Sequence, residues 1–164
     1  MFVLVKRLTA TQRKSSKFKV DATDMQIIRS LQEDSRVSLR KLSQKTGVTS
    51  TMLRNRIATL EDQRIIRGYV PVLDGTKMGY AVTAVIMLQI EGGHLQEVEA
   101  EIARESNVVS VYDVTGEYDA IIFAKFRDNP SLNDFLKNLL TEKFIKRSST
   151  VVALNAVKEH TKII

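Results

Sequence analysis

Residues 38–63 read SLRKLSQKTGVTSTMLRNRIATLEDQ, two short segments with helical apolar spacing on either side of a glycine. Ser38 and Thr49 each open one segment, and serine and threonine are residue types that cap helix N-termini. Gly47 lies between the segments and can take the left-handed backbone conformation of a tight turn. The predicted helices are residues 38–45 and 49–63.

A third helix is predicted upstream of this pair. Asp21 is its expected N-cap, and Asp24 lies in its first turn, near the positive end of the helix dipole. An apolar stripe continues to Leu31 before the helix ends near Asp34. Three short helices with a glycine in the turn between the last two match the helix-turn-helix pattern. We therefore predict a winged-type helix-turn-helix DNA-binding domain over residues 20–66.

The last helix of this domain has one apolar side and one polar side. At about 100° per residue, Leu53, Ile57 and Leu60 fall within roughly 60° of arc. Between Thr49 and Leu60 there are two arginines and no acidic residue, whereas a merely solvated helix face usually mixes both signs of charge. Arginine and asparagine hydrogen-bond base edges bidentately, and threonine offers a hydroxyl or a methyl group.

The polar side of the last helix, together with the start of the helix before it, is therefore the predicted DNA interface. Base contacts are expected from Thr51, Arg54, Asn55 and Thr59, and phosphate contacts from Arg40 and Arg56. The complete predicted set is Ser38, Arg40, Thr49, Ser50, Thr51, Arg54, Asn55, Arg56 and Thr59.

The charge distribution is consistent with a polyanionic partner. The formal net charge is +6, but residues 1–75 hold 15 Lys and Arg against 7 Asp and Glu, whereas residues 76–164 hold 10 against 12. The first half therefore attracts polyanions, although charge alone does not separate DNA, RNA and an anionic membrane. Residues 1–19 carry six of the basic residues and are interpreted as a basic arm, which either contacts DNA phosphates or is a disordered leader.

The second half of the chain alternates strand and helix patterns. The order βαββαβ over residues 80–164 is the ferredoxin-like arrangement, a four-stranded antiparallel sheet with two helices on one face. The uncovered face carries spare apolar positions, so we expect a second subunit to cover it. The predicted elements are strands 81–90, 108–115, 118–126 and 148–157, and helices 95–106 and 129–140, the second capped by Asn129.

The two halves are joined by residues 67–79, interpreted as a linker strand and hinge. Residues 65–73 are apolar and β-prone, with Pro71 compatible with a strand edge, and are predicted as a connecting strand. The expected class is α+β: an N-terminal winged-type helix-turn-helix domain joined by a linker strand to a C-terminal ferredoxin-like domain.

Catalysis and metal binding find little support in the sequence. The chain has no cysteine, its only histidines are His94 and His160, and it has no phosphate-cradling glycine-rich loop. We expect no enzyme activity, no metal and no cofactor. No apolar stretch approaches the about 18 residues of a membrane span, and the N-terminal pattern is not that of a secretory signal. A cytoplasmic protein without a membrane partner is expected.

The order of these parts, and several motifs within them, resembles the Lrp/AsnC (feast/famine) family of transcription regulators over roughly residues 20–160. The DNA-binding half and linker are similar in Val20-Asp21-Ala22-Thr23-Asp24, in the stretch from Ser38 to Glu61, and in Ile65-Ile66-Arg67-Gly68-Tyr69 with Leu73-Asp74. The second half is similar in Val114-Thr115-Gly116-Glu117-Tyr118-Asp119 and in Arg147-Ser148-Ser149-Thr150. Two positions depart from the family pattern: Arg64, where a glycine is usual, and Ser148, where a threonine is usual.

The resemblance implies a dimer joined through the C-terminal sheets, often assembled into tetramers, octamers or larger rings, with a small molecule bound between dimers. The small molecule is usually an amino acid. At the predicted strand junction, Gly116 lets a carboxylate approach backbone N–H groups and Asp119 offers an acceptor to an α-ammonium group. The alternative is a plain turn capped by Asp119. The predicted effector residues are Gly116, Glu117, Tyr118, Asp119, Ser148 and Thr150.

The predicted function is therefore a sequence-specific DNA-binding transcriptional regulator whose oligomer responds to a small-molecule effector, an amino acid by resemblance. The alternative is a stand-alone amino-acid-sensing regulatory subunit of a metabolic enzyme, with residues 20–66 as a docking module. The expected partners are double-stranded DNA, an amino acid or related small molecule, and further copies of the chain.

Overall fold

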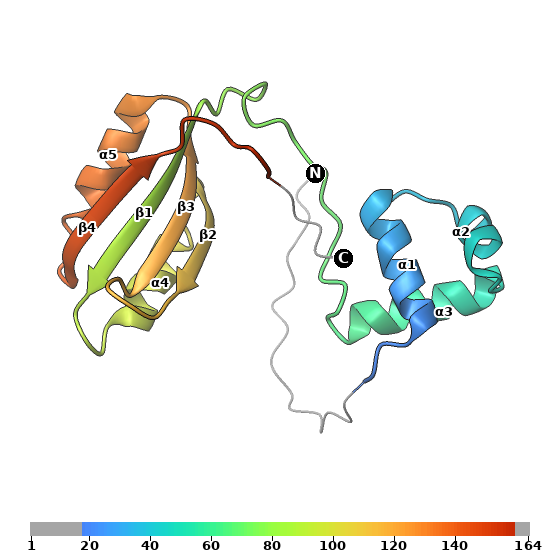
Figure 1. Cartoon of the computed structure of the whole chain (residues 1–164). Helices are drawn as coiled ribbons and strands as arrows, with labels where there is room; N and C mark the ends of the chain where they lie inside the picture. Colours follow the sequence, from blue (N-terminus) through green and yellow to red (C-terminus); the bar gives the residue numbers. More distant parts are fainter. Residues whose placement is uncertain (1–17, 160–164) are drawn as a thin grey trace, which may run out of the picture. The chain divides into compact units, whose positions relative to one another are not determined.

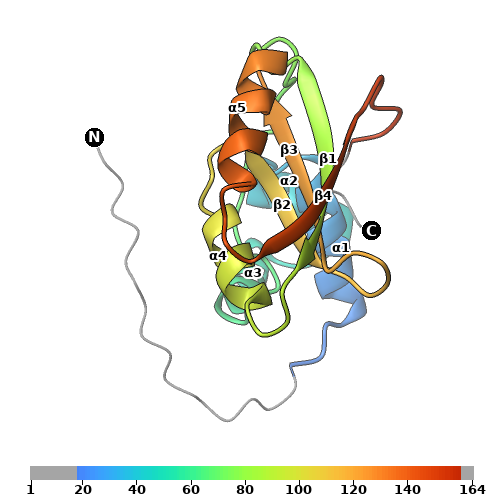
Figure 2. The same ribbon diagram turned by 90° about the vertical axis from the view of Figure 1, so that its left-hand side faces the viewer.

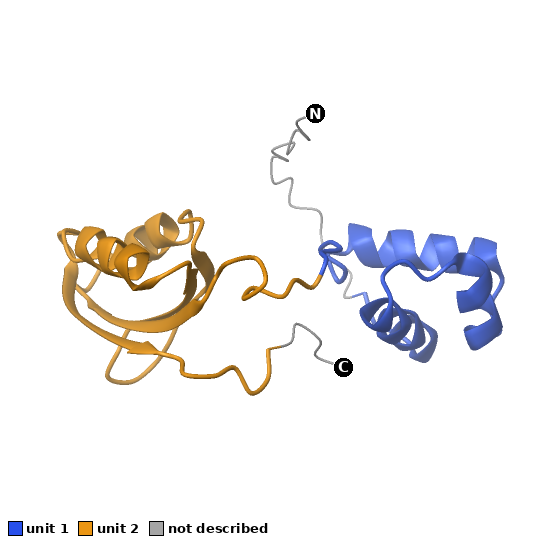
Figure 3. Ribbon diagram, turned by 90° about the horizontal axis from the view of Figure 1, so that it is seen from above, with its two compact units in different colours: residues 1–71, 161–164 blue, residues 72–160 orange. Residues whose placement is uncertain are grey.

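The computed structural model describes residues 18–159 (Figure 1). The described chain divides between Pro71 and Val72 into two compact units, shown in different colours in Figure 3. Each unit has a hydrophobic core of its own, and the two cores share no residue. Most of the predicted basic arm, residues 1–17, lies outside the described residues, so its role stays a prediction.

The first unit consists of three helices, α1 (Ala22–Glu33), α2 (Leu39–Thr46) and α3 (Ser50–Asp62). The predicted N-caps are confirmed: the side chains of Asp21, Ser38 and Thr49 accept hydrogen bonds from backbone N–H groups in the first turns of the three helices. Gly47 ends α2 with a φ of 70°, the left-handed turn conformation expected from the sequence.

One buried cluster holds the three helices together. Ile27 of α1, Leu42 of α2, and Leu53 and Leu60 of α3 are almost completely buried against one another. Burial of each such side chain contributes about 1.5–3 kcal/mol of hydrophobic stabilisation. Because Leu53 and Leu60 point into this cluster, the other side of α3 is turned toward solvent, which is the orientation that the sequence predicts.

The second unit is an antiparallel sheet with two helices on one face, as Figure 2 shows for α4 and α5. The strand order β2-β3-β1-β4 confirms the ferredoxin-like prediction. Alternate residues of β1 and β3 are buried toward the helices and form the core of the unit. The elements are β1 (Val82–Ile90), α4 (Leu95–Ile102), β2 (Val108–Asp113), β3 (Ala120–Phe126), α5 (Asn129–Leu139) and β4 (Ile145–Val152).

The face of the sheet opposite the helices carries a row of apolar side chains. Cross-strand partners share a face, so the pairs Val85–Phe123 and Met87–Ile121 lie together there. Tyr112 of β2 pairs with Ile121 and meets the ring of Phe123 edge to face at 6.2 Å. Phe123 and Tyr112 are exposed, which leaves this face uncovered in the single chain.

The predicted connecting strand over residues 65–73 is wrong. Residues 67–73 form neither helix nor strand, and their backbone groups make no backbone hydrogen bond with the described part of the chain. A β-strand requires a second strand to accept and donate its hydrogen bonds, and apolar β-prone residues do not supply one.

Several predicted boundaries also shift. Strand β4 covers 145–152 rather than 148–157, because its register is fixed against β1, where Ile90 pairs with Ile145. The turn predicted at 116–117 is a loop of residues 114–119, since β2 ends at Asp113 and β3 begins at Ala120. Helix α4 ends at Ile102 rather than at Ser106. Asp128, not Asn129, caps α5, in a capping box with Ser131.

Candidate functional site

The outward face of α3 presents exposed polar side chains and a cationic side chain that has no ion-pair partner among the described residues. Ser50, Thr51, Arg54 and Asn55 are exposed, and the side chain of Arg54 forms no ion pair with any of residues 18–159. Arg40, in the first turn of α2, is likewise exposed and without an ion-pair partner among those residues. These donors are therefore available to an external acceptor.

Three of the predicted contact residues already make local hydrogen bonds. The hydroxyls of Ser38 and Thr49 accept from the N–H groups of Lys41 and Met52 as N-caps. The hydroxyl of Thr59 donates to the carbonyl oxygen of Asn55 at 2.9 Å. A side chain bound in this way is held in one rotamer, but its remaining lone pairs or its methyl group can still meet a ligand.

Arg56 lies in a different environment from Arg54. Its Nη1 atom donates to Asp21 Oδ2 at 2.7 Å and to Asp24 Oδ1 at 2.8 Å, so one nitrogen bridges the N-cap carboxylate of α1 and a carboxylate of its first turn. These bonds raise the pKa of the guanidinium. The pKa of Asp21 is lowered, mainly by the hydrogen bond from the backbone N–H of Asp24 and next by the hydrogen bond from Arg56. The predicted phosphate anchor thus has partners within the protein.

Met52 is an exposed residue of α3 that sequence reasoning left out. An apolar side chain on a recognition helix can contact the methyl group of thymine. The signal was available in the sequence, since Met52 falls outside the arc of Leu53, Ile57 and Leu60 at about 100° per residue.

The predicted effector residues of the β2–β3 loop lie at one end of the sheet. Gly116 has a φ of 129°, a conformation that residues with a Cβ atom rarely adopt. Asp119 Oδ2 accepts from the backbone N–H of Ile90 at 2.7 Å, where the β1–β4 register shifts between Gln89 and Ile90. One carboxylate oxygen of Asp119 therefore stabilises an irregularity of β1.

The loop is held on the uncovered face by two residues that were not predicted. Gln89 Nε2 donates to the carbonyl oxygen of Glu117 at 2.8 Å, and Arg147 Nη1 lies 3.4 Å from Glu117 Oε1. Gln89 pairs with Arg147 across β1 and β4, so both side chains share that face. Sequence reasoning missed these residues because the contacts are 28 and 30 positions apart.

Ser148 and Thr150 are directed to the other face of β4. They pair with Leu88 and Ile86, whose side chains are buried under the helices. In the single chain, the structure brings the loop 116–119 together with Gln89 and Arg147, but places these two hydroxyls on the opposite face. Tyr118 is half-buried within the loop.

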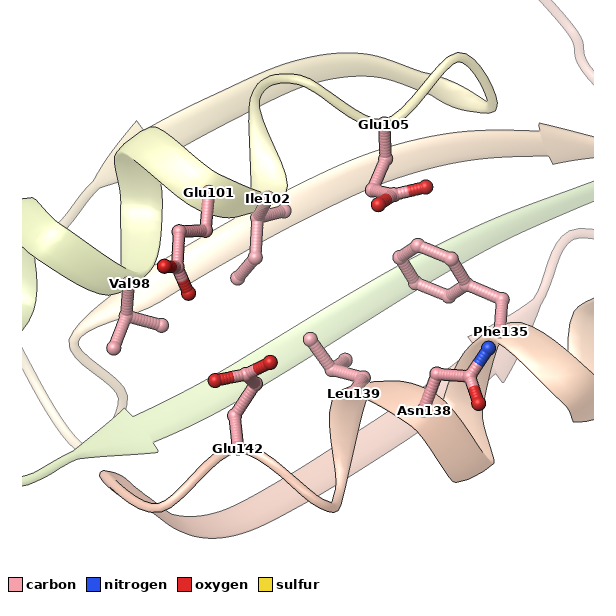
Figure 4. Close-up of a pocket in the computed structure, with 8 residues that line it drawn as sticks. All are labelled: Val98, Glu101, Ile102, Glu105, Phe135, Asn138, Leu139 and Glu142. Atoms are coloured by element: carbon pink, nitrogen blue, oxygen red, sulfur yellow. The ribbon is translucent and has the colours of Figure 1, made fainter.

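A separate small pocket, of about 120 Å³, lies between α4 and α5 (Figure 4). Its floor is apolar, with Val98, Ile102 and Leu139; Glu101 approaches the pocket from α4, and Glu142 approaches it from the turn that follows α5. Glu105 adds a third carboxylate, and no cationic side chain lines the pocket. The carboxylate of a free amino acid would be repelled there, and none of the predicted effector residues contributes to it.

Within residues 18–159, no helix is long and apolar enough to cross a bilayer. No group of three or more potential metal ligands occurs in the same part of the chain.

Comparison with known proteins identifies both units. Residues 20–61 match the model of the AsnC-type helix-turn-helix domain, and residues 83–163 match that of the Lrp/AsnC ligand binding domain. The chain is 42% identical over 140 residues to an uncharacterized HTH-type transcriptional regulator of Pyrococcus furiosus, covering 85% of this chain and 95% of the relative.

Solved structures of similar proteins have the same fold. A transcriptional regulator of Neisseria meningitidis, in complex with L-methionine, matches with a TM-score of 0.82 and 26% identity over 89% of this chain and 97% of that one. An AsnC family transcriptional regulator of Agrobacterium tumefaciens matches with a TM-score of 0.80 and 26% identity over 88% of this chain and 96% of that one.

Proposed function

This chain belongs to the Lrp/AsnC family of transcriptional regulators, and from that premise we propose that α3 binds double-stranded DNA sequence-specifically under the control of an amino-acid effector. The observation that carries the proposal is the outward face of α3 between Ser50 and Thr59, which holds no acidic residue and where Arg54 and Asn55 have exposed side chains. Arginine recognises guanine and asparagine recognises adenine bidentately in the major groove.

The local structure supports this role for α3. The helix begins at an N-cap directly after the Gly47 turn, and the N-terminal residues of a recognition helix are those that meet base edges. Ser50 and Thr51 are exposed at that end. Arg40 lies at the start of α2, where a phosphate would also meet the positive end of the helix dipole. We assign base contacts to Thr51, Arg54 and Asn55, and a phosphate contact to Arg40.

Replacing Arg54 tests the DNA-binding proposal. The full chain is first used to select binding sites from a random duplex library, and the selected duplex is then titrated with Arg54→Ala by fluorescence anisotropy. Loss of one bidentate base contact should weaken specific binding by about 5- to 150-fold, equivalent to about 1–3 kcal/mol. Arg29→Ala is the matched control, because it removes the same charge from an exposed position of α1. Wild-type affinity in Arg54→Ala would refute the assignment of α3.

We further propose that the uncovered sheet face joins two copies of the chain. Val85, Met87, Ile121 and Phe123 present a contiguous apolar surface there, and such a surface buries itself most simply in a two-fold symmetric dimer. Larger assemblies, as tetramers or octamers, would follow from contacts between dimers.

The effector proposal places an amino acid at the β2–β3 loop. The relative from Neisseria meningitidis was solved with L-methionine, which supports an amino acid as the ligand class. In this chain, the second oxygen of Asp119 can accept a hydrogen bond from an α-ammonium group, and Arg147 and the backbone at Gly116 can meet a carboxylate. The loop is open in the single chain, so we expect a neighbouring subunit to complete the site, including any contribution from Ser148 and Thr150.

Thermal unfolding in the presence of each of the twenty amino acids tests this proposal. A ligand that binds only the folded protein at one hundred times its Kd stabilises it by about 2.7 kcal/mol. Asp119→Ala should abolish the shift. Asp119→Asn is the sharper variant, because its amide oxygen can still accept from Ile90 N–H while the negative charge is removed. An unchanged shift in both variants, or no shift with any amino acid in the wild type, would refute the effector assignment.

A further inference from the structure

The cation at Arg56 joins α3 to the first turn of α1. One nitrogen of its guanidinium reaches Asp21, the N-cap of α1, and Asp24, the third residue of that helix. The same two acidic residues form a capping box, in which Asp21 Oδ1 accepts from Asp24 N–H and Asp24 Oδ2 accepts from Asp21 N–H. Arg56 therefore binds the two oxygens that the capping box leaves over.

Burial makes this connection specific. The Asp24 side chain is only 4% exposed, and its two oxygens are satisfied by Asp21 N–H and by Arg56. If α3 moved away from α1, a buried carboxylate would lose its only cationic partner among the described residues, which is costly. The apolar contacts between these helices, made by Ile27, Leu53 and Leu60 among others, have less directional preference than hydrogen bonds.

We propose that Arg56 is a positioning residue for DNA recognition: by bridging Asp21 and Asp24 it fixes how α3 is rotated on α1, and it sets the affinity for DNA without contacting a phosphate. The inference rests on the proposed DNA-binding function. Arg54 and Asn55 directly precede Arg56 in α3, so a small rotation of the helix displaces both base contacts. Without the bridge, only part of the population would hold α3 correctly, and the apparent affinity would fall in proportion to that fraction.

The dependence of binding on salt separates positioning from phosphate contact. Each phosphate neutralised by a protein cation adds about 0.9 to the slope of log K against log salt concentration. We would measure Kd for the selected duplex over a series of KCl concentrations with wild type, Arg40→Ala, Arg56→Gln, Asp24→Asn, and the double variant Asp24→Asn with Arg56→Gln. Arg40→Ala should lower the slope by about 0.9, as a phosphate contact. Arg56→Gln should weaken binding about tenfold and leave the slope unchanged.

For Asp24→Asn, a pure charge effect and loss of the bridge predict opposite changes in DNA affinity. Removing an acidic group should tighten binding to a polyanion if only charge matters, whereas loss of the bridge should weaken it about tenfold. The double variant places two neutral amides together and leaves no buried charge unpaired, so it keeps the unit folded and should bind no more weakly than either single variant. Hydrogen exchange confirms that each variant is folded during the titration.

The inference is overturned if Arg56→Gln lowers the slope by about 0.9, as Arg40→Ala does, or if Asp24→Asn binds as tightly as wild type. Failure of the proposed function looks different: Arg54→Ala and Arg40→Ala would then both bind with wild-type affinity, and no variant of α3 would respond.

Discussion

Truncation of Leu60 should destabilise the first unit and leave the stability of the second unchanged. The Leu60 side chain is completely buried in the cluster of Ile27, Leu42 and Leu53, and Leu→Ala at such a site costs about 2–5 kcal/mol. The carbonyl of Leu60 accepts from the N–H groups of Ile65 and Ile66, and these bonds do not depend on the side chain. The loss is therefore one of packing.

The size of the unit sets the consequence of that loss. At about 0.05–0.15 kcal/mol per residue, a unit of roughly 50 residues has a free energy of unfolding of about 3–8 kcal/mol. A cost near 3 kcal/mol would remove a large share of this, and it would raise the population of the unfolded unit by about a hundredfold. Because the core of the second unit contains no residue of the first, its stability should not change.

Hydrogen exchange followed by mass spectrometry measures both units in one sample. In Leu60→Ala, amides of α1, α2 and α3 should exchange about a hundredfold faster, whereas those of β1 and β3 should keep the wild-type rate. Leu88→Ala is the matched control, because Leu88 is completely buried in the core of the second unit and should give the reverse pattern. Equal acceleration in both units of Leu60→Ala would refute the independence of the two cores.

Three further predictions concern single side chains. The pKa of Glu99 is raised, mainly by burial and next by the negative charge of Asp113, so the charged form of Glu99 is disfavoured in the folded state. Glu99→Gln should therefore raise the melting temperature at pH 7, and the gain should disappear below about pH 4, where the glutamate is protonated in both states; a gain independent of pH would contradict this account. The pKa of Tyr69 is raised to about 12, mainly by burial and next by its hydrogen bond to Glu61. The protonated tyrosine therefore stabilises the folded state below about pH 10, and this contribution is lost as the pH rises toward 12. Tyr69→Phe should lack this alkaline loss, and identical alkaline melting curves would argue against it. Finally, Phe123→Asp should place a charge in the uncovered sheet face and convert the proposed dimer to monomers in analytical ultracentrifugation, whereas the exposed Leu140→Asp should not; a dimeric Phe123→Asp variant would exclude this face as the interface.

The sequence predicted the helical unit closely because its determinants are local. Each N-cap bonds to a backbone group three residues away, so Asp21, Ser38 and Thr49 could be identified from neighbouring residues alone. Arg64, the position at which the family usually has a glycine, has a φ of 59°, two residues after α3 ends at Asp62. A residue with a Cβ atom costs about 1 kcal/mol in this conformation.

The failures are non-local. The strand expected over residues 65–73 has suitable residue types, but strand formation depends on a partner that lies elsewhere. Arg56 falls on the flank of α3 by periodicity, yet its partners lie 32 and 35 positions away and cannot be read from spacing. At α5 both Asp128 and Asn129 are cap-forming residue types, and the reciprocal bonds between Asp128 and Ser131 decide between them. The fold could therefore be predicted almost completely, whereas the partners of individual site residues could not.

Residues 67–73, which pair with no strand among the described residues, have a consequence for the DNA sequences that the proposed dimer would accept. Seven residues span at most about 25 Å when extended, and successive base pairs are about 3.4 Å apart. Two such tethers can take up a change of several base pairs in the distance between half-sites, which in rigid helix-turn-helix dimers is fixed near 34–36 Å. We therefore expect affinity to fall gradually as the half-site spacing is changed. Within that trend, affinity should vary with a period of one DNA turn, because both half-sites must lie on the same face of the duplex.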